Sequence, residues 1–274
     1  MNIVLNELKK IINNSEAILI TAGAGMGVDS GLPDFRSNEG FWKAYPPMKE
    51  LGLSFERLAS PKWFEKDPAL AWGFYGHRLN LYRKTIPHRG FALLKALVEA
   101  KQNNYFIYTS NVDGQFQKAG FDDMKIVECH GSIHYNQCVK SCSSILWSNC
   151  DDTVEVDETL FRAKEPMPSC LICQELARPN ILMFGDGGWN SNRKNEQSAR
   201  FALWRDKVMK EAQSLCIIEI GAGENIPTVR DMGEHLCKKI KATLIRINPK
   251  DTWVPSKQYS LKMGGLDGLE SLLA

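Results

Sequence analysis

Four cysteines stand in two close pairs, Cys138/Cys142 and Cys170/Cys173, and this spacing is typical of a metal site. Eight cysteines in a chain of 274 residues do not form the disulfide framework of a small secreted domain. Four thiolates complete a tetrahedral shell around zinc and leave no open position for a substrate. We therefore expect one structural zinc at these four cysteines, with Cys150 as an alternative to one of them. Four reduced thiols packed as small apolar groups are the competing interpretation.

A second set of polar residues follows short apolar runs. Asn111 and Asp113 come after the run at 105–108, and His130 comes after the run at 125–128. If both runs are parallel strands, their carboxyl ends lie at one edge of a sheet, which is where such sheets bind ligands. An imidazole has an ordinary pKa of about 6.5 and can act as a general base near neutral pH. Asn and Asp also favour helix caps, and a cap is compatible with a ligand contact.

Glycine-rich turns follow other apolar runs. The run at 17–20 leads into Gly23-Ala24-Gly25-Met26-Gly27. Val28 stands where the common dinucleotide fingerprint has a glycine, so the ordinary dehydrogenase motif is absent. Glycines still allow a backbone to approach a pyrophosphate at a helix N-terminus. A second such turn occupies 221–223.

In order along nearly the whole chain, these segments resemble the motifs of the sirtuin (Sir2) family. The run GAGMGVDSGLPDFR is similar to the family's GAG and SGIPDFR signature, and TSNVD to its TQN-x-D. His130-Gly131 resembles the catalytic HG. The remaining matches are Arg178-Pro179 with Phe184-Gly185-Asp186 for RP…FGE, Gly221-Ala222-Gly223 in place of GTS, and Ile247-Asn248 for IN.

The resemblance implies an NAD-dependent protein-lysine deacylase. In that reaction the acyl oxygen attacks the ribose carbon, nicotinamide leaves, and the acyl group ends on ADP-ribose. A histidine base draws a proton through the ribose hydroxyls, and a structural zinc holds the small lobe. The partner would be acylated lysine on a protein. Matching the motifs residue by residue implies that His130, Asn111 and Asp113 are catalytic and that Phe184 and Gly185 contact the substrate. The residues implied to bind the cofactor are Gly23, Ala24, Gly25, Asp34, Phe35, Arg36, Ser110, Asn111, Asp113, Gly221, Ala222, Gly223 and Asn248.

Tyr75 and Arg78 form a Y-x-x-R pair, which resembles the family branch that removes acidic acyl groups such as succinyl and malonyl. Three residues apart on a helix, the two side chains share one face. A guanidinium and a phenol hydroxyl can then hold a carboxylate. An aromatic core face beside a solvated arginine is the other interpretation.

Several positions depart from the family pattern. Ser110 replaces a glutamine, Gly27 a serine, and Asp186 a glutamate, while the turn at 221–223 lacks two hydroxyl donors. The segment 187–200 opens with two glycines and lacks the expected proline. In the family, a substrate backbone pairs as an added strand between this segment and the 221–223 turn. The departures therefore affect the protein-substrate slot more than they affect NAD binding.

Short apolar runs alternate with helical patterns, which indicates an α/β fold with a Rossmann-like doubly wound parallel sheet. An aromatic-rich stretch and the cysteine-containing stretch interrupt this alternation, and we expect them to form a smaller helical and zinc-binding domain. The expected sheet runs are 17–20, 105–108, 125–128, 181–184, 215–220 and 243–247, and the expected helices are 3–13, 89–103, 196–213 and 228–241. The expected NAD-binding domain is 1–37, 88–132 and 178–274, and the expected small domain is 38–87 and 133–177.

Composition excludes several classes of protein. Hydrophobic residues make up 43% of the chain, and 34 Lys+Arg against 32 Asp+Glu give a net charge of +2. Neither intrinsic disorder nor direct nucleic-acid binding is expected from these values. No apolar run approaches the roughly 20 residues that cross a bilayer. We expect a soluble, cytoplasmic protein that does not contact a membrane.

Two other functions remain open at this stage. The altered slot can exclude an acyl-lysine strand and leave an ADP-ribosyltransferase or NAD glycohydrolase. A non-catalytic NAD or ADP-ribose sensor is the third hypothesis, although such a module has no need of Asn111, Asp113 and His130 together.

Overall fold

The computed structural model defines most of the chain. The predicted cofactor residues Asp34, Phe35 and Arg36 lie outside the described residues. The described ranges are 2–33, 38–157, 159–211, 213–240 and 242–274.

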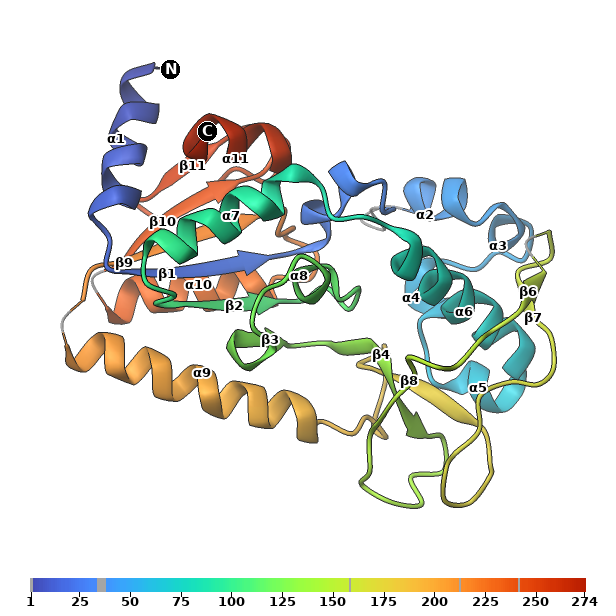
Figure 1. Cartoon of the computed structure of the whole chain (residues 1–274). Coiled ribbons are helices and arrows are strands. Elements are labelled where there is room, and N and C mark those ends of the chain that lie inside the picture. Colours follow the sequence, from blue (N-terminus) through green and yellow to red (C-terminus); the bar gives the residue numbers. More distant parts are fainter. Residues whose placement is uncertain (1, 34–37, 158, 212, 241) are drawn as a thin grey trace.

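A six-stranded, entirely parallel sheet forms the centre of the larger part of the molecule (Figure 1). Its inner strands are apolar runs buried on both sides, as expected where helices cover both faces of a sheet. The register places Thr21 beside Tyr108 on one side and Glu219 on the other. Across the sheet the order is β11 (Tyr259–Leu261), β10 (Ala242–Ile247), β9 (Leu215–Ile220), β1 (Ala17–Ala22), β2 (Tyr105–Thr109) and β3 (Ile126–Glu128).

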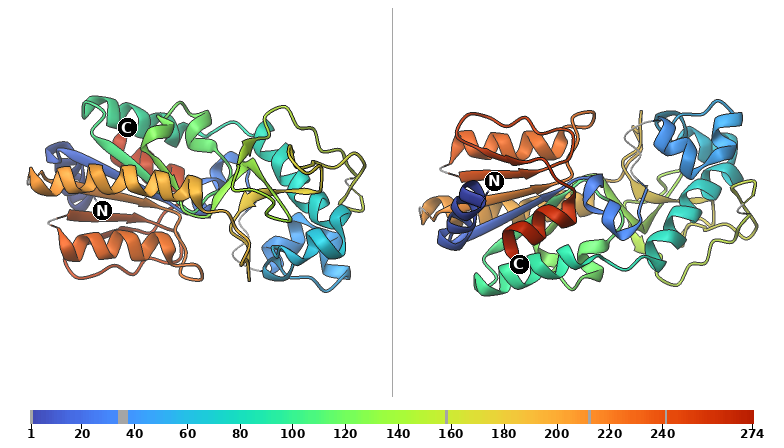
Figure 2. Two further views of the ribbon diagram at one scale, coloured as in Figure 1. Left: turned by 90° about the horizontal axis from the view of Figure 1, so that it is seen from below. Right: turned by 90° about the horizontal axis from the view of Figure 1, so that it is seen from above.

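Helices cover both faces of this sheet, which confirms the predicted doubly wound fold (Figure 2). The N-terminal helix is amphipathic and buries Leu8 and Ile12 against the sheet. One core cluster lies under α1 (Asn2–Asn14), α7 (Arg89–Ala100), α8 (Gln115–Lys118) and α11 (Gly265–Leu273), and the opposite cluster lies under α9 (Asn192–Lys210) and α10 (Thr228–Lys239).

The prediction that 181–184 is a strand of the main sheet is wrong. The strand β8 (Ala177–Ile181) pairs antiparallel with β4 (Gly131–Cys138), and Ile181 lies opposite Gly131. Leu182 and Phe184 are each 40% exposed, whereas the inner strands of a parallel sheet are buried throughout. The sixth strand of the main sheet is β11, which pairs in parallel with β10.

The glycine turn after β1 leads into two 3₁₀ turns, η1 (Ala24–Met26) and η2 (Val28–Ser30). Gly31 ends η2 in the left-handed conformation with φ +83°. His88 is the N-cap of the predicted helix α7, and its Nδ1 accepts from the Gly90 amide at 3.0 Å. The Nε2 of the same ring lies 2.9 Å from the Met26 carbonyl and donates to it. His88 is therefore structural, and it joins α7 to the glycine turn.

The aromatic-rich stretch is helical, as predicted. Its core contains Trp72, Phe74 and Tyr75, all at most 1% exposed. Phe64 stacks on Tyr75 with ring centroids 5.7 Å apart. The helices are α2 (Asn38–Ala44), α3 (Pro46–Glu50), α4 (Phe55–Leu58), α5 (Lys62–Lys66) and α6 (Pro68–Lys84).

The rest of the smaller part is built on a three-stranded antiparallel sheet in the order β5-β4-β8. This sheet crosses the predicted domain boundaries, because β4 begins before residue 133 and β8 continues past residue 177. No helix in the described ranges is both long and apolar enough to span a bilayer. The short strands here are β5 (Trp147–Ser148), β6 (Val156–Asp157) and β7 (Arg162–Ala163), whereas the 3₁₀ turn η3 (Asp123–Lys125) leads into β3 of the larger part.

Candidate functional site

Two glycine turns meet at the carboxyl edge of the parallel sheet. The Gly25 amide donates to the Gly221 carbonyl at 3.0 Å, so the turns after β1 and β9 are joined through their backbones. Gly221 has φ +62°, and a Cβ there would lie 2.4 Å from the Gly25 backbone. Only glycine permits this approach. The result is a cradle of bare backbone, which suits the pyrophosphate of a dinucleotide.

Asn248 supports this cradle from the end of β10. Its side chain is fully buried, and its Nδ2 donates to the Ala222 carbonyl at 2.8 Å. Its Oδ1 accepts from the amides of Lys250 and Asp251. The side chain of Asn248 is thus engaged with the protein itself, and it fixes the backbone of the 221–223 turn.

The end of β2 places Asn111 beside the first glycine turn. Thr109 Oγ1 donates to the Ala22 carbonyl at 2.9 Å and accepts from the Asn111 amide at 3.0 Å. Asn111 Nδ2 then donates to the Gly23 carbonyl at 3.0 Å. The Ser110 amide donates to the Ala22 carbonyl at 3.1 Å. The structure therefore brings Ser110 and Asn111 to the same edge as the glycine cradle.

Asp113 is a buried carboxyl group at this edge, 9% exposed. Its Oδ1 accepts from the Gln115 amide at 2.9 Å. Burial raises the pKa of Asp113 to about 6, with a further rise from the negative charge of Glu128 and an opposing effect of the Arg78 guanidinium. Asp113 therefore changes charge just below neutral pH, which is typical of functional carboxyl groups.

His130 follows β3 and precedes β4. Burial lowers the pKa of its imidazole below the usual value, so the ring is a free base at neutral pH. The His130 carbonyl accepts from the Leu182 amide at 2.9 Å. Gly131 has φ +79°, and a Cβ at this position would lie 2.0 Å from the Asn180 carbonyl. This close backbone contact fixes the direction in which His130 leaves the sheet.

The predicted substrate residues Phe184 and Gly185 lie on a turn that a buried ion pair stabilises. Both oxygens of Asp186 accept from the Arg178 guanidinium, and Oδ2 also accepts from the Met183 amide. The Phe184 amide donates to the Ala59 carbonyl at 2.9 Å, and its ring is 40% exposed. Asp186, a departure from the family motif, thus closes this turn.

Tyr75 and Arg78 are both buried on α6, contrary to the alternative of a solvated arginine. Arg78 Nε donates to the Tyr82 hydroxyl at 3.0 Å, and its guanidinium lies 5.7 Å from the centre of the Tyr75 ring. The Tyr75 hydroxyl is buried and has no hydrogen-bond partner among the described residues. Burial raises the pKa of Tyr75 to about 12, so this hydroxyl remains a donor.

The four predicted cysteines form one cluster. All four Sγ atoms lie within 4.8 Å of one another, with 3.6 Å between Cys138 and Cys173 and 3.5 Å between Cys142 and Cys170. A tetrahedral zinc with Zn–S bonds of about 2.3 Å requires S–S distances of about 3.8 Å. The cluster therefore fits one zinc ion. Cys150, the alternative ligand, is exposed and is not part of it.

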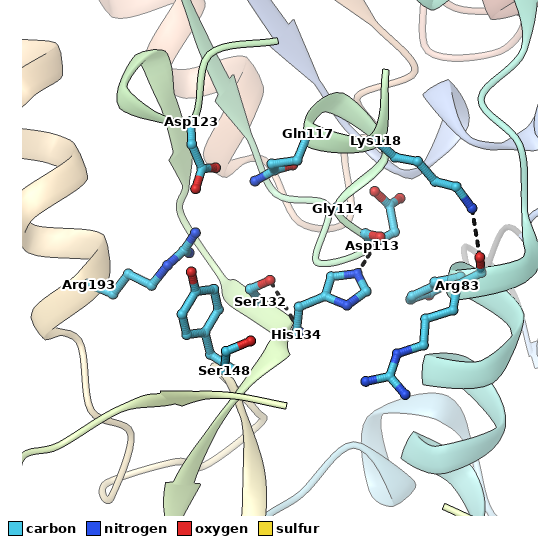
Figure 3. Close-up of a pocket in the computed structure, with 12 residues that line it drawn as sticks. Arg83, Asp113, Gly114, Gln117, Lys118, Asp123, Ser132, His134, Ser148 and Arg193 are labelled. Carbon is cyan, nitrogen blue, oxygen red and sulfur yellow. Dashed lines mark hydrogen bonds between the residues drawn. The ribbon is translucent and has the colours of Figure 1, made fainter. Parts of the chain in front are cut away.

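Sequence reasoning missed Glu128 and its partners on α9. Glu128 is 1% exposed, and its Oε2 accepts from Arg193 Nη1 and from Gln197 Nε2. The only sequence signal was a carboxyl residue two positions before His130, because Arg193 lies 65 residues further along the chain. Arg193 and Asp113 both line a pocket of about 380 Å³ (Figure 3).

With this geometry in place, comparison with known proteins is decisive. A sequence model described as Sir2 family matches residues 23–202. The chain belongs to the Sir2 family. An NAD-dependent protein deacylase of Leptospira interrogans is 30% identical over 237 residues, covering 86% of this chain and 82% of that protein. An NAD-dependent protein deacylase of Aquifex aeolicus is 31% identical over 235 residues, covering 86% of this chain and 84% of that protein.

Solved Sir2 structures share the fold. A Sir2 homologue in complex with NAD superposes with a TM-score of 0.70 at 22% identity, covering 98% of this chain and 92% of that one. The predicted Sir2 membership and the fold class are thus confirmed. The roles of the individual residues within the site remain predictions.

Proposed function

We propose that this Sir2 protein is an NAD-dependent protein deacylase, which transfers the acyl group of a modified lysine to ADP-ribose and releases nicotinamide. The observation that carries the proposal is that Asn111 donates to the Gly23 carbonyl beside the Gly25–Gly221 cradle, while Asp113 and His130 follow the neighbouring parallel strands β2 and β3 at the same sheet edge. The deacylase relatives, which match over most of their length, support it.

The cradle fits NAD because glycines at 23 and 221 let the two turns approach each other with no side chain between them, since a Cβ at either position would collide with the facing backbone. When bound, NAD supplies the ribose carbon that is attacked and the nicotinamide that leaves. We assign the pyrophosphate to the turns 23–25 and 221–223, with Asn248 as their support. Ser110 and Asn111 would face the nicotinamide ribose, and Asp34, Phe35 and Arg36 would complete the site as the motif implies.

His130 would act as the general base. A neutral imidazole can accept a proton from a ribose hydroxyl, and burial keeps His130 neutral at pH 7. Asp113, ionised above about pH 6, would accept a hydrogen bond from the nicotinamide carboxamide. Both residues are thus in the required form at neutral pH and above.

Within the proposed activity, Tyr75 and Arg78 favour an acidic acyl group such as succinyl. A buried hydroxyl without a partner and a guanidinium against the same ring form a site for a carboxylate. The charges of Arg178 and Asp186 also act on Tyr75, so this residue lies close to the turn of Phe184 and Gly185. We expect Tyr75→Phe to lower kcat/KM for succinyl-lysine peptides while preserving it for acetyl-lysine peptides.

One observation favours NAD hydrolysis or ADP-ribosyl transfer as a second candidate. The segment expected to pair with a substrate backbone is bonded within this chain, because the Gly188 carbonyl accepts from Gln137 Nε2 at 2.8 Å. The Asn190 amide donates to the other end of the same Gln137 amide at 3.1 Å. In this alternative the slot is already filled, and water or another acceptor receives ADP-ribose.

Nicotinamide release from NAD distinguishes the candidates. The protein is incubated with NAD alone and with acetyl-, succinyl- and longer-acyl-lysine peptides, and the products are identified by mass spectrometry. Release that requires an acylated peptide and yields O-acyl-ADP-ribose supports the deacylase. Equal release without peptide supports hydrolysis or ADP-ribosyl transfer, and NAD binding without release supports a sensor. The His130→Ala variant controls for contaminating activity and should retain NAD binding.

A further inference from the structure

Arg193 lies between an aromatic ring and a buried carboxylate. Its guanidinium carbon is 4.2 Å from the centre of the Tyr135 ring, and its Nη1 donates to Glu128 Oε2. The Arg193 side chain is 15% exposed and that of Glu128 only 1%. A buried carboxylate requires such a partner, because leaving it uncompensated is unfavourable.

Gln197, one helical turn further along α9, completes the clamp on β3. Its Nε2 donates to Glu128 Oε2 at 3.3 Å, and its Oε1 accepts from the Glu128 amide at 3.0 Å. Two residues of α9 therefore hold the last residue of β3, and His130 follows two positions later. The family motifs in the sequence include neither Arg193 nor Gln197.

The charge of Glu128 acts on Asp113. Glu128 Oε1 has no hydrogen-bond partner among the described residues, so only Arg193 and Gln197 offset this carboxylate through hydrogen bonds. The groups that face Asp113 are the Gln115 amide on α8, Arg78 and Tyr82 on α6, and Glu128 on β3. His134 on β4 donates to the Asp113 carbonyl at 2.9 Å, as Figure 3 shows, and burial keeps this imidazole neutral by lowering its pKa.

We propose that Arg193 is a positioning residue of this enzyme: by neutralising Glu128 it keeps Asp113 ionised and holds the turn that carries His130. The inference rests on the proposed function for the role of Asp113, but the electrostatic coupling itself can be measured without turnover. Arg193 acts through Glu128, and we assign it no contact with substrate.

Replacing Arg193 and replacing Glu128 should shift the pKa of Asp113 in opposite directions. Arg193→Gln leaves the negative charge of Glu128 uncompensated, so the pKa of Asp113 should rise by about one pH unit. Glu128→Gln removes that charge and leaves Arg193 positive, so the pKa of Asp113 should fall. The double variant R193Q/E128Q carries neither charge and should return it close to the wild-type value. A purely structural role predicts no opposite shifts and no recovery in the double variant.

The titration of Asp113 is followed by carboxyl ¹³C NMR, with the signal assigned from its loss in Asp113→Asn, and the pH profile of kcat/KM is measured beside it. The matched control is Arg205→Gln, because Arg205 is on the same helix and pairs only with Asp206 in the described part of the chain. Opposite shifts support the proposal. If the titration midpoint of Asp113 is the same in the wild type and both single variants, or moves in the same direction in both, the proposal is overturned.

If Arg193→Gln does not fold, Glu128→Gln alone decides, and an unshifted Asp113 in that variant overturns the proposal. If the wild-type protein shows no deacylation while the opposite shifts are present, the proposed function fails and the coupling stands.

Discussion

The carboxylate of Asp186 accepts two hydrogen bonds from the guanidinium of Arg178, and both side chains are at most 4% exposed. Arg178 Nη2 also donates to the Ile181 carbonyl at 2.9 Å. Arg178 therefore holds the chain both before Phe184, at Ile181, and after it, at Asp186. Asp186 has one methylene fewer than the glutamate of the family motif, and its carboxylate also accepts from the backbone of the turn. The turn is therefore closed on itself.

We expect Asp186→Asn to destabilise the protein by about 3–5 kcal/mol, because it leaves a buried guanidinium uncompensated. The KM for an acylated peptide should rise while NAD affinity is retained. Urea denaturation and peptide kinetics measure the two effects. Asp206→Asn is the control, since Asp206 is 61% exposed in its ion pair with Arg205 and should contribute at most about 1 kcal/mol. Equal losses in both variants would contradict the assignment.

The acidic limb of the pH profile should lie near pH 6. His130 must be neutral, and burial lowers its pKa, so this residue loses its function only below its ordinary range. Asp113 must be ionised, and its pKa of about 6 places the loss of its negative charge in this range. Accordingly, kcat/KM should fall as the pH decreases through about 6. A limb centred above pH 7 would show that another group controls the reaction.

Asp113 should reduce stability at neutral pH. Its folded-state pKa of about 6 exceeds the unfolded value of about 3.9, so the folded protein binds more protons between these values. Stability therefore decreases as the pH rises through this window. We expect Asp113→Asn to raise the free energy of unfolding by about 1–3 kcal/mol at pH 7.5 and to have little effect at pH 4. Denaturation at both pH values measures this free energy, and a variant less stable than the wild type at pH 7.5 would refute the prediction.

Gly221→Ala should weaken NAD binding. The added Cβ would lie 2.4 Å from Gly25, and φ +62° is unfavourable for alanine by about 1–2 kcal/mol. The two turns must then separate, and we expect at least about a tenfold increase in the Kd for NAD. Isothermal titration calorimetry provides the value. Gly187→Ala is the matched control, because nothing lies within 4 Å of its added Cβ. An unchanged Kd in the Gly221 variant would show that the cradle is not part of the NAD site.

Metal analysis should give one zinc per chain. Cys142→Ser should lower both the zinc content and the melting temperature, the latter by about 5 °C or more. Cys150→Ser serves as the control, since Cys150 is an exposed thiol outside the cluster. Finding equal zinc contents in the two variants would argue against the predicted ligand set.

The inner strands of the sheet were predictable because each is an apolar run buried on both faces. β11 was not predicted, since Tyr259 to Leu261 is only three residues long and two of them are half-buried. Its pairing with β10 follows from the three-dimensional fold and leaves no periodic signal. The error at 181–184 has a similar origin, because apolar composition alone does not distinguish a strand of the main sheet from a half-exposed segment.

Within the site, the sequence motifs predicted which residues follow the strand ends, whereas the residues that support them, such as Arg193 and Gln197, gave no signal in the sequence. Asn111 and His130 each stand two positions beyond the end of a strand, and their placement at the sheet edge depends on strand order. The Arg193–Glu128 pair joins α9 to β3 across 65 residues, and charge pairs at that separation cannot be found from spacing. Tertiary packing alone creates this contact.

The small antiparallel sheet connects the cysteine cluster to His130 and to the turn of Phe184. β4 begins directly after His130 and ends at Cys138, a span of about 27 Å at the usual rise per residue. β8 returns from the other cysteine pair towards Phe184. The cysteine cluster thus lies at one end of the β4–β8 pair, and His130 and the turn of Phe184 follow from its other end. Oxidation of these thiolates, or loss of a zinc ion bound to them, would weaken the anchor of the two strands, and we expect it to disorder the His130 side chain and the turn of Phe184 and Gly185.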